Sequence, residues 1–443
     1  MSAVVEERDL YRSDFESFER ARAGDPAWVR TLRGDAIDRF AAIGFPSHRD
    51  EAWRSTNVAP IARVSFRRAA EEDSGASATA LPRISGAPHP QLVFVNGRLA
   101  TELSTVDGTS GLQLSGLRTA LARDAAALEP HLGRVATDAA HPFTALNTAF
   151  LDDGAVVRIA PGAVIEAPIH LVFVSEPGGD PLVSHPRVLI VAGSGSQAVV
   201  VETYVGAPGL PAFTNAVTEI AAQAGAILDH YKVQREADTA FHVATIAVSQ
   251  GRGSNITQHN LALGGALART DINVLLAAEG AESVLNGLFV GSGTQLLDNH
   301  TLVDHASPHC TSRQLYKGIL DGKSRGVFHG KVIVRPDAQK TDAVQTNRNL
   351  LLSREALVSS TPALEIRADD VKCRHGSTIG QLDPLALFYL RSRGIAEADA
   401  RALLVYGFAA DVTGRIRIPA IREGIEAFLG LRLPGAAGAR ELA

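Results

Sequence analysis

A recurring glycine turn is the feature that most constrains the fold of this chain. From about residue 150 to 380, short runs of Val, Ile, Leu and Thr alternate with glycine and asparagine turns, without a long helical pattern. Turn glycines precede new strands at Gly162, Gly195, Gly225, Gly253 and Gly280, with spacings of 33, 30, 28 and 27 residues. Such a repeat favours a stacked sheet such as a β-helix. On this pattern alone, a β-sandwich with long strands remains an alternative.

Helical periodicity replaces this pattern at both ends of the chain. Residues 1–65 are predicted to form an N-terminal helical domain. In its DPAWVRTLRGDAIDRFAAIGFP stretch, Asp25 is expected to cap a helix, Pro26 to fit the first turn and Gly44 to end it. A linker and mixed segment is expected at 66–145, with a hairpin around the Asn-Gly pair in QLVFVNGRLA.

The second half of the chain divides in the same way. The β core is predicted to span 146–380, and a C-terminal helical domain to span 381–433. Asp383, followed by a proline, is the expected start of the first helix of that domain. The last segment, 434–443, is rich in glycine and alanine and is expected to be a disordered tail.

Charge and composition exclude several classes of partner. A net charge of −5 argues against a nucleic-acid partner, which usually selects a basic surface. No apolar run approaches the roughly 20 residues of a membrane span, so no membrane partner is expected. The acid-rich start has no apolar signal core and indicates a cytoplasmic protein. The two cysteines, Cys310 and Cys373, are too few for a disulfide framework and suit a reducing compartment.

A histidine-rich stretch raises the question of a metal site. It contains His300, His305, His309 and His329, together with Asp304 and Cys310. Imidazole, thiolate and carboxylate all bind metals, yet the stretch has no HxH or CxxC spacing. Histidines hydrogen-bonded within a turn-rich β region are the favoured interpretation. A nucleophile pair of His309 and Cys310 is disfavoured, since adjacent strand residues point to opposite faces.

The stretch VKCRHGSTIG places a second thiol beside an imidazole. On a strand, Cys373 and His375 share one face, with Cα atoms about 6.5–7 Å apart, while Lys372 and Arg374 point the other way. The nearby positive charge is expected to favour the thiolate, the form that binds metal. From the pattern alone, a shared metal site and a structural pair are equally open.

A set of longer motifs places this stretch in a family context. QTNRNLLLS, LEIRADDVKCRHGSTIG and FYLRSRGI follow one another over Gln345–Ile395, and CTSRQLYKG, FHGKVIV and KTDAVQTN extend the set toward the N-terminus. These motifs resemble the C-terminal core of the SufB/SufD family of the SUF iron–sulfur cluster assembly machinery. GFPSHRDEAWRSTN at 44–57 is similar to the family's N-terminal signature. The resemblance therefore covers almost the whole chain.

The resemblance implies a mainly β fold, with a right-handed parallel β-helix core flanked by N-terminal and C-terminal helical domains. It also implies a non-catalytic scaffold subunit of a SufB–SufC–SufD complex, which supports assembly of nascent iron–sulfur clusters at the SufB–SufD interface. SufB is the paralogous partner, and SufC is the ABC-type ATPase that hydrolyses ATP. For the isolated chain, a homodimer is one of the forms considered, and the sequence leaves the oligomeric state open.

The resemblance also assigns roles to particular residues. Cys373 and His375 are the implied ligands of a transient cluster or iron shared with SufB, with His375 the stronger candidate, and no cofactor is held permanently. Ser353 stands about where SufB carries a cysteine, which places the chain on the SufD side, since clusters prefer thiolates. The implied SufC-docking residues are Phe388, Tyr389, Leu403, Leu404 and Phe408.

Two other functions remain as alternatives. The first is a stand-alone β-helix enzyme, with Asp298, Asp304 and His305 as its catalytic groups. Against it, only 5% of the residues are aromatic, and such enzymes often bind sugars on aromatic platforms. The second is a purely structural subunit, in which Cys373 is a core residue and the chain transmits motion from the ATPase to its paralogue.

Overall fold

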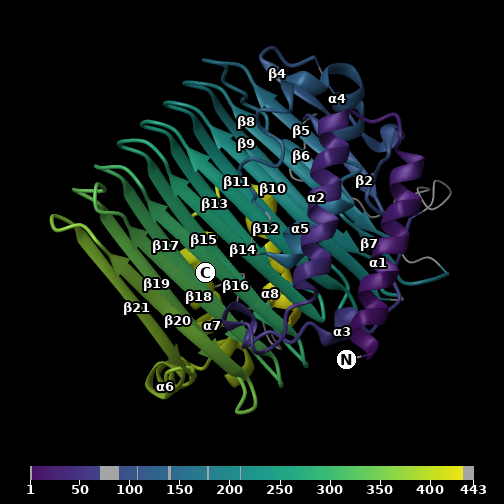
Figure 1. Ribbon diagram of the computed structural model, residues 1–443. Coiled ribbons are helices and arrows are strands. Elements are labelled where there is room, and N and C mark those ends of the chain that lie inside the picture. Colours follow the sequence, from purple (N-terminus) through teal and green to yellow (C-terminus); the bar gives the residue numbers. More distant parts are fainter. Residues whose placement is uncertain are drawn as a thin grey trace.

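Over residues 187–380, consecutive strands of this chain alternate between two sheets that run side by side along the molecule (Figure 1). The computed structural model describes residues 2–69, 89–106, 108–137, 141–176, 179–209 and 211–432. Sheet A has 11 strands: β1 (Arg67–Arg68), β4 (Leu112–Gly116), β5 (Gly154–Ile159), β7 (Leu182–Ser184), β8 (Arg187–Ala192), β10 (Ala212–Ala222), β12 (Phe241–Gln250), β14 (Leu267–Leu276), β16 (Leu296–His305), β18 (Arg325–Val334) and β20 (Leu357–Ile366).

Sheet B has 10 strands: β2 (Gln91–Val95), β3 (Arg98–Leu99), β6 (Ile169–Ser175), β9 (Gln197–Gly206), β11 (Ile227–Arg235), β13 (Asn255–Ala262), β15 (Glu282–Gly291), β17 (Thr311–Leu320), β19 (Asp342–Leu351) and β21 (Lys372–Gly380). From β8 onward each strand pairs in parallel with the strand two places later in the chain. This is a parallel β-solenoid, so the mainly β prediction is confirmed and the sandwich is excluded.

The predicted repeat of left-handed turns is present, and it continues at two turns where the left-handed residue is not glycine. Gly225 and Gly253 have φ angles of 68° and 61°, a left-handed conformation that glycine adopts without steric cost. His309 and Lys340 take the same conformation, with φ angles of 58° and 61°, at the corresponding turns before β17 and β19. The turns stack on one another, because the backbone N–H of His309 donates to the carbonyl of Gln339 over 2.9 Å.

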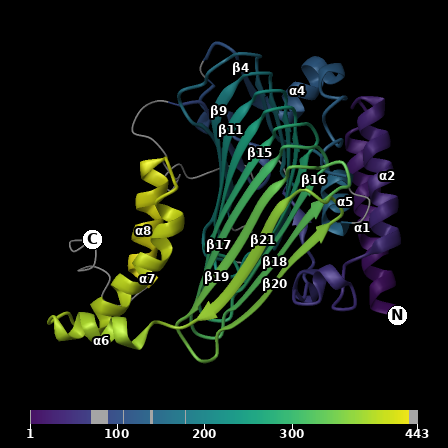
Figure 2. The ribbon, with the colours of Figure 1, turned by 90° about the vertical axis from the view of Figure 1, so that its left-hand side faces the viewer.

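Helices cover the outer faces of the two sheets. They are α1 (Ser2–Ala21), α2 (Ala27–Ile43), α3 (Ala59–Ala62), α4 (Leu117–Asp124), α5 (Pro142–Ala149), α6 (Pro384–Ser392), α7 (Glu397–Thr413) and α8 (Pro419–Arg432), with short 3₁₀ segments at Glu51–Trp53, Thr101–Leu103 and Ala125–Ala127. The α5 helix packs on β10 and β12 of sheet A, and α1 and α2 pack on α5. The α7 helix packs on β15 and β17 of sheet B, so Figure 2 shows the sheets between the two sets of helices.

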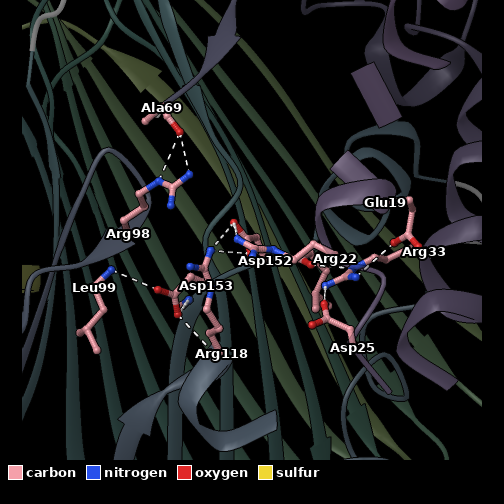
Figure 3. A network of polar contacts seen from close by, with 12 residues as sticks. Glu19, Arg22, Asp25, Arg33, Ala69, Arg98, Leu99, Arg118, Asp152 and Asp153 are labelled. Atoms are coloured by element: carbon pink, nitrogen blue, oxygen red, sulfur yellow. Dashed lines mark hydrogen bonds and ion pairs between the residues drawn. The ribbon is translucent and has the colours of Figure 1, made fainter. Parts of the chain in front are cut away.

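A network of ion pairs fastens the N-terminal helices to the solenoid (Figure 3). Asp152 accepts hydrogen bonds from Arg22 and Arg118 over 2.8 and 2.7 Å. Burial alone would raise the pKa of Asp152, but these two guanidinium groups hold it below its ordinary value. The predicted capping role of Asp25 is wrong: Pro26 is the N-cap, and the Asp25 carboxylate accepts from Arg33 over 2.7 Å.

Other sequence predictions for the flanking segments hold. Gly44 ends α2, with its backbone N–H donating to the carbonyl of Phe40. Asn96 and Gly97 form the turn of the β2–β3 hairpin, both with positive φ. The Asp383 carboxylate caps α6 by accepting from the N–H of Leu385 over 2.8 Å.

The predicted domain limits stay predictions, since element boundaries alone do not define units that fold separately. Residues 70–88 of the expected linker and mixed segment, and the whole expected tail at 434–443, lie outside the described residues. Within the described part of the chain, no helix is long and apolar enough to cross a membrane.

The two ends of the solenoid differ. At the N-terminal end, β4 pairs antiparallel with β5, and the β2–β3 hairpin closes the edge of sheet B. At the other end, β20 and β21 are the last strands of their sheets, and among the described residues neither has a further strand beside it. We call this C-terminal end, formed by β20 and β21, the open end.

The turn positions yield a first prediction. Gly280 has a φ of 72° with open space around its Cα, so Gly280→Ala should be destabilising through backbone strain alone. We expect the free energy of unfolding to fall by about 1–2 kcal/mol. His309→Gly, at the next turn, should not lower it, since glycine relieves the strain already present there. Denaturant unfolding of both variants beside the wild type is the measurement. An unchanged stability of Gly280→Ala would contradict this account of the repeat.

Candidate functional site

Cys373 and His375 lie on β21, the edge strand of sheet B at the open end. In the register with β19, Cys373 is beside Ala343 and His375 is beside Gln345. Cys373 packs against an apolar cluster that includes Val332 and Ala343, which places it on the inner side of the solenoid. Side chains two residues apart share one face of a strand, so His375 also belongs to the inner side. The predicted strand, with both residues on one face, is therefore present.

The inner side of the open end is lined by small polar groups that the sequence did not single out. The Ser377 hydroxyl donates to the Ser360 hydroxyl, and Ser360 donates to the side-chain oxygen of Asn347, both over 2.7 Å. The amide of Asn349 also donates to Asn347, over 2.6 Å. These groups come from β19, β20 and β21. Only the alternation of β21 could have indicated Ser377, and nothing in the sequence paired it with Ser360 of the other sheet.

The surroundings of Cys373 favour the protonated thiol over the thiolate. Burial raises the pKa of Cys373 above its ordinary value, and the Asp342 carboxylate adds to the increase, while the backbone N–H of Ala343 opposes it. The exposed neighbours Lys372 and Arg374 point away from the thiol side. Neither residue is among the causes of the shift, so the direction of the Cys373 pKa runs against the expectation that they favour the thiolate.

Two donors do not complete a metal site. Among the described residues, no group of three or more His, Cys, Asp and Glu side chains is placed to hold a metal ion. Iron–sulfur clusters are held by about four ligands, mostly thiolates. Cys373 and His375 can therefore supply part of a ligand set, and the remaining ligands would have to come from another chain or from the cargo itself.

The histidine-rich stretch is spread over different faces and forms no single site. The rings of His300 and His329 contact each other on the outer side of sheet A, with their Nδ1 atoms 3.3 Å apart. His305 is buried on the inner side, where its Nε2 atom lies 2.9 Å from the Ser312 hydroxyl, and burial lowers its pKa to about 4. His309 is the exposed turn residue described above.

The cysteine of this stretch is a core residue. Cys310 is fully buried in the main hydrophobic cluster, and burial raises the pKa of its thiol. Since His309 is exposed and Cys310 is buried, the disfavoured nucleophile pair does not form. His309 and Cys310 are neighbours only because they belong to the same turn of the solenoid.

The groups considered for a β-helix enzyme are also separated. Asp298 is buried and accepts hydrogen bonds from Arg269 and Thr56. Asp304 is held by Arg335, while His305, the next residue on the same strand, faces the interior. Groups on opposite faces of one strand cannot act on one bound substrate.

The C-terminal helices expose the predicted docking residues to different degrees. None of the residues of α6 is buried, and Phe388 and Tyr389 are 70% and 56% exposed. On α7, Leu403, Leu404 and Phe408 are half-buried. Figure 2 shows α6 at the far end of the helical group, projecting beyond the sheets. Large exposed apolar side chains of this kind commonly mark a surface that a partner covers.

One buried cation connects these helices to sheet B. The Lys317 amine on β17 donates to the backbone carbonyl of Phe408 over 2.6 Å and to the carboxylate of Asp411 over 2.5 Å. It also lies 4.3 Å from the centre of the Phe408 ring. The hydrogen bond from Lys317 lowers the pKa of Asp411. No sequence pattern indicates this contact, because 94 residues separate Lys317 from Asp411.

The fold and the site together define a class of protein: a parallel β-solenoid with one uncapped end, an inward thiol–imidazole pair at that end and an exposed C-terminal helix. Family comparison gives the class its name. Residues 173–408 match the family model described as SUF system FeS cluster assembly, SufBD core domain, and residues 6–171 match the SufBD protein N-terminal region. The chain belongs to the SufBD family of iron–sulfur cluster assembly proteins.

Individual relatives agree with this assignment. The chain is 34% identical over 400 residues to an iron–sulfur cluster assembly SufBD family protein of Synechocystis, covering 88% of each chain. It is 32% identical over 403 residues to the iron–sulfur cluster assembly protein SufD of Escherichia coli, covering 90% of this chain and 92% of the relative. It is 27% identical to SufD of Bacillus subtilis, with the same coverage.

The thiol chemistry yields a second prediction. Because the pKa of Cys373 is raised, its alkylation by iodoacetamide should be slow at neutral pH and rise about tenfold per unit between about pH 7 and pH 9. Cys310 should stay unmodified in the folded protein because it is fully buried. Peptide mass mapping over time measures both, with Cys373→Ser as the control. A rate for Cys373 that levels off below pH 8 would reveal a thiolate and contradict the structure.

Proposed function

We propose that this chain is a non-catalytic scaffold subunit of a SufB–SufC–SufD complex. In this proposal, nascent iron–sulfur clusters form at the contact between its open end and SufB, while SufC hydrolyses the ATP. The carrying observation is the inward pair of Cys373 and His375 on an uncapped edge strand. An incomplete ligand set at an uncapped end suits a site that is completed by a second protein.

The open end has the properties of a surface for another β-solenoid. Edge strands expose backbone N–H and C=O groups that can pair with a further strand. The edge strands of the open end also expose large apolar side chains, since Leu357, Ile366 and Ile379 are 55%, 43% and 51% exposed. A paralogue with the same fold presents the same kind of edge, which supports SufB as the partner. A second copy of this chain is the corresponding partner in isolation.

Within the pair, His375 is the stronger ligand. Cys373 is partly packed against apolar side chains, and burial raises the pKa of its thiol, so it contributes to the inner packing of the last turn. His375 is exposed on the same side and is free to reach a cargo between two subunits. The cluster or iron is treated as cargo held transiently with SufB, so no permanent cofactor is proposed.

The C-terminal helices are the proposed contact with SufC. The α6 helix exposes Phe388 and Tyr389, and it packs against α7, whose Leu403, Leu404 and Phe408 are half-buried. The relatives are named as assembly proteins, which supports a subunit without turnover of its own. A cytoplasmic location remains part of this proposal, since free thiols such as Cys310 and Cys373 suit a reducing compartment.

The ligand role is tested by His375→Ala, co-expressed with SufB and SufC and purified without oxygen. We expect cluster content, measured as iron and acid-labile sulfide per complex and as visible absorbance, to fall severalfold, because one ligand is lost at the interface. Arg374→Ala, an exposed neighbour on the opposite face of β21, is the matched control and should leave the content unchanged. Equal cluster content in the two variants would remove the ligand role and leave a structural subunit.

The docking role is tested by Leu404→Glu and Phe388→Glu. Each places a charge on the proposed apolar surface, and we expect SufC affinity to fall by about tenfold or more. Phe388 is 70% exposed, so its variant should keep the thermal midpoint of the wild type and separate docking from folding. Leu431→Glu, on an exposed position of α8, is the control. Unchanged co-purification of SufC with both variants would place its contact elsewhere.

A further inference from the structure

Polar side chains occupy many positions along one side of the solenoid interior, with an interruption on β15 at Leu285 and Gly287. The in-register stacking of sheet B produces columns of inward side chains, each one residue per strand. One such column reads, from β9 to β21, Val200, His230, Gln258, Leu285, Gln314, Gln345 and His375. The next inward column reads Glu202, Lys232, Asn260, Gly287, Tyr316, Asn347 and Ser377. Both columns end on the strand that carries the candidate site.

Sheet A meets these columns with polar side chains of its own. Lys232 donates to the Thr270 hydroxyl over 3.2 Å, and the amide of Asn260 donates to Asn299 over 2.9 Å. Further along, Thr301 donates to the side-chain oxygen of Gln314 over 2.8 Å. We call this set the polar lane: Glu202, His230, Lys232, Gln258, Asn260, Thr270, Asn299, Thr301, Gln314 and Gln345.

A neighbouring inward column of sheet A shows that apolar side chains can also fill this interior. The inward residues of sheet A beside the lane are aliphatic: Ile220, Val248, Val274, Val303 and Val332 occupy one column from β10 to β18. These side chains are at most 2% exposed. Aliphatic side chains in the lane would avoid the free-energy cost of burying polar groups. The presence of polar side chains there therefore requires a physical explanation.

The inner end of the lane is a buried charge cluster. The Glu202 carboxylate lies 2.8 Å from the Nε2 atom of His230 and accepts from Thr218 and Tyr204 over 2.8 and 2.6 Å. Burial alone would raise the pKa of Glu202, but these contacts hold it below its ordinary value. Burial lowers the pKa of Lys232 to about 8. Groups of this kind exchange protons, yet every side chain of the cluster is closed off from bulk solvent.

Several polar side-chain atoms in the middle of the lane have no hydrogen-bond partner in the described part of the protein. Within the part of the chain that the structure describes, both polar atoms of the Gln258 side chain lack a hydrogen-bond partner. The same holds for the side-chain nitrogens of Asn299 and Gln314 and for the side-chain oxygen of Gln345. These four side chains are at most 3% exposed. Buried polar atoms of this kind are normally satisfied by ordered water.

The outer end of the lane reaches solvent. The amide of Gln345 donates to the side-chain oxygen of Gln314 over 3.3 Å, so the two glutamines form the last buried step. The next member of that column is His375, which is exposed on the edge strand. The lane therefore has one end at the buried cluster and the other beside the candidate site.

We propose that the polar lane is hydrated and that it carries water and protons between the solvent at His375 and the buried cluster of Glu202, His230 and Lys232. Protons move along it by exchange between water and the side-chain groups, so no bond to carbon or sulfur is made or broken. The ligand of this internal site is water. The proposal concerns the isolated chain and does not depend on SufB, SufC or a cluster.

Side-chain amide exchange tests the proposal directly. After transfer of the ¹⁵N-labelled full-length chain into D₂O, the NH₂ groups of Gln258 and Gln314 should exchange about tenfold or more faster than that of Asn147. Asn147 is equally buried, but its amide is satisfied by the carbonyls of Pro186 and Asn215. Gln258→Met and Gln314→Met each remove one signal and so assign it.

A second variant tests where the lane opens. Gln345→Met replaces the outermost buried polar side chain by an apolar one of similar length. It should slow exchange at Gln314 severalfold and leave Asn147 unchanged, because it closes the route from the open end. Exchange at Gln258 and Gln314 as slow as at Asn147 would overturn the hydrated lane. Exchange at Gln314 that is unaffected by Gln345→Met would overturn the opening at His375.

Discussion

In-register parallel pairing is the constraint on which the rest of this structure depends. Each strand of the solenoid pairs with the strand two places along the chain, so every side chain lies beside its counterpart in the next turn. Such a stack has no natural closure, and its last turn exposes a strand edge in each sheet. The N-terminal end solves this with antiparallel strands at β4 and β3, whereas the C-terminal end has no such cap among the described residues. The exposed edge is thus the feature that supports the proposed contact with a partner.

The same stacking decides what the interior can contain. Some polar residues sit beside a polar residue of the next turn, so the hydrogen bond between Gln314 and Gln345 runs along the axis. Others do not, since Gln258 lies beside Leu285. A single buried polar side chain in an apolar stack would remain unpaired and would cost free energy. In the polar lane, both polar atoms of the Gln258 side chain have no partner among the described residues, while contacts between the two sheets offset part of that cost. This explains why the polar groups are gathered on one side while the valines occupy the other.

Much of the fold can be predicted from the sequence because its signals are local. The glycine turns reveal the repeat, and the two-residue period of a strand is enough to place Cys373 and His375 on one face. The glycine signal ends at Gly280, since His309 and Lys340 take over the same left-handed turn and no local pattern identifies them. The capping prediction for Asp25 fails because the buried guanidinium of Arg33 binds its carboxylate more favourably than the helix end does. The raised pKa of Cys373 arises from burial against side chains of other strands, such as Val332 and Ala343, which strand periodicity does not report.

The two proposed partner surfaces belong to one sheet, and this bears on how they could be coupled. Sheet B carries α7 on its outer side and Cys373 and His375 on its inner side at the open end. Lys317 on β17 binds α7 through Asp411. In the strand register, Lys317 lies beside Arg348 of β19, and Arg348 lies beside Thr378 of β21. A displacement of α7 relative to the sheet therefore acts on a strand only two places from the edge. Since backbone hydrogen bonds join β17, β19 and β21, the helices cannot move rigidly with β17 without also moving the strand that presents His375.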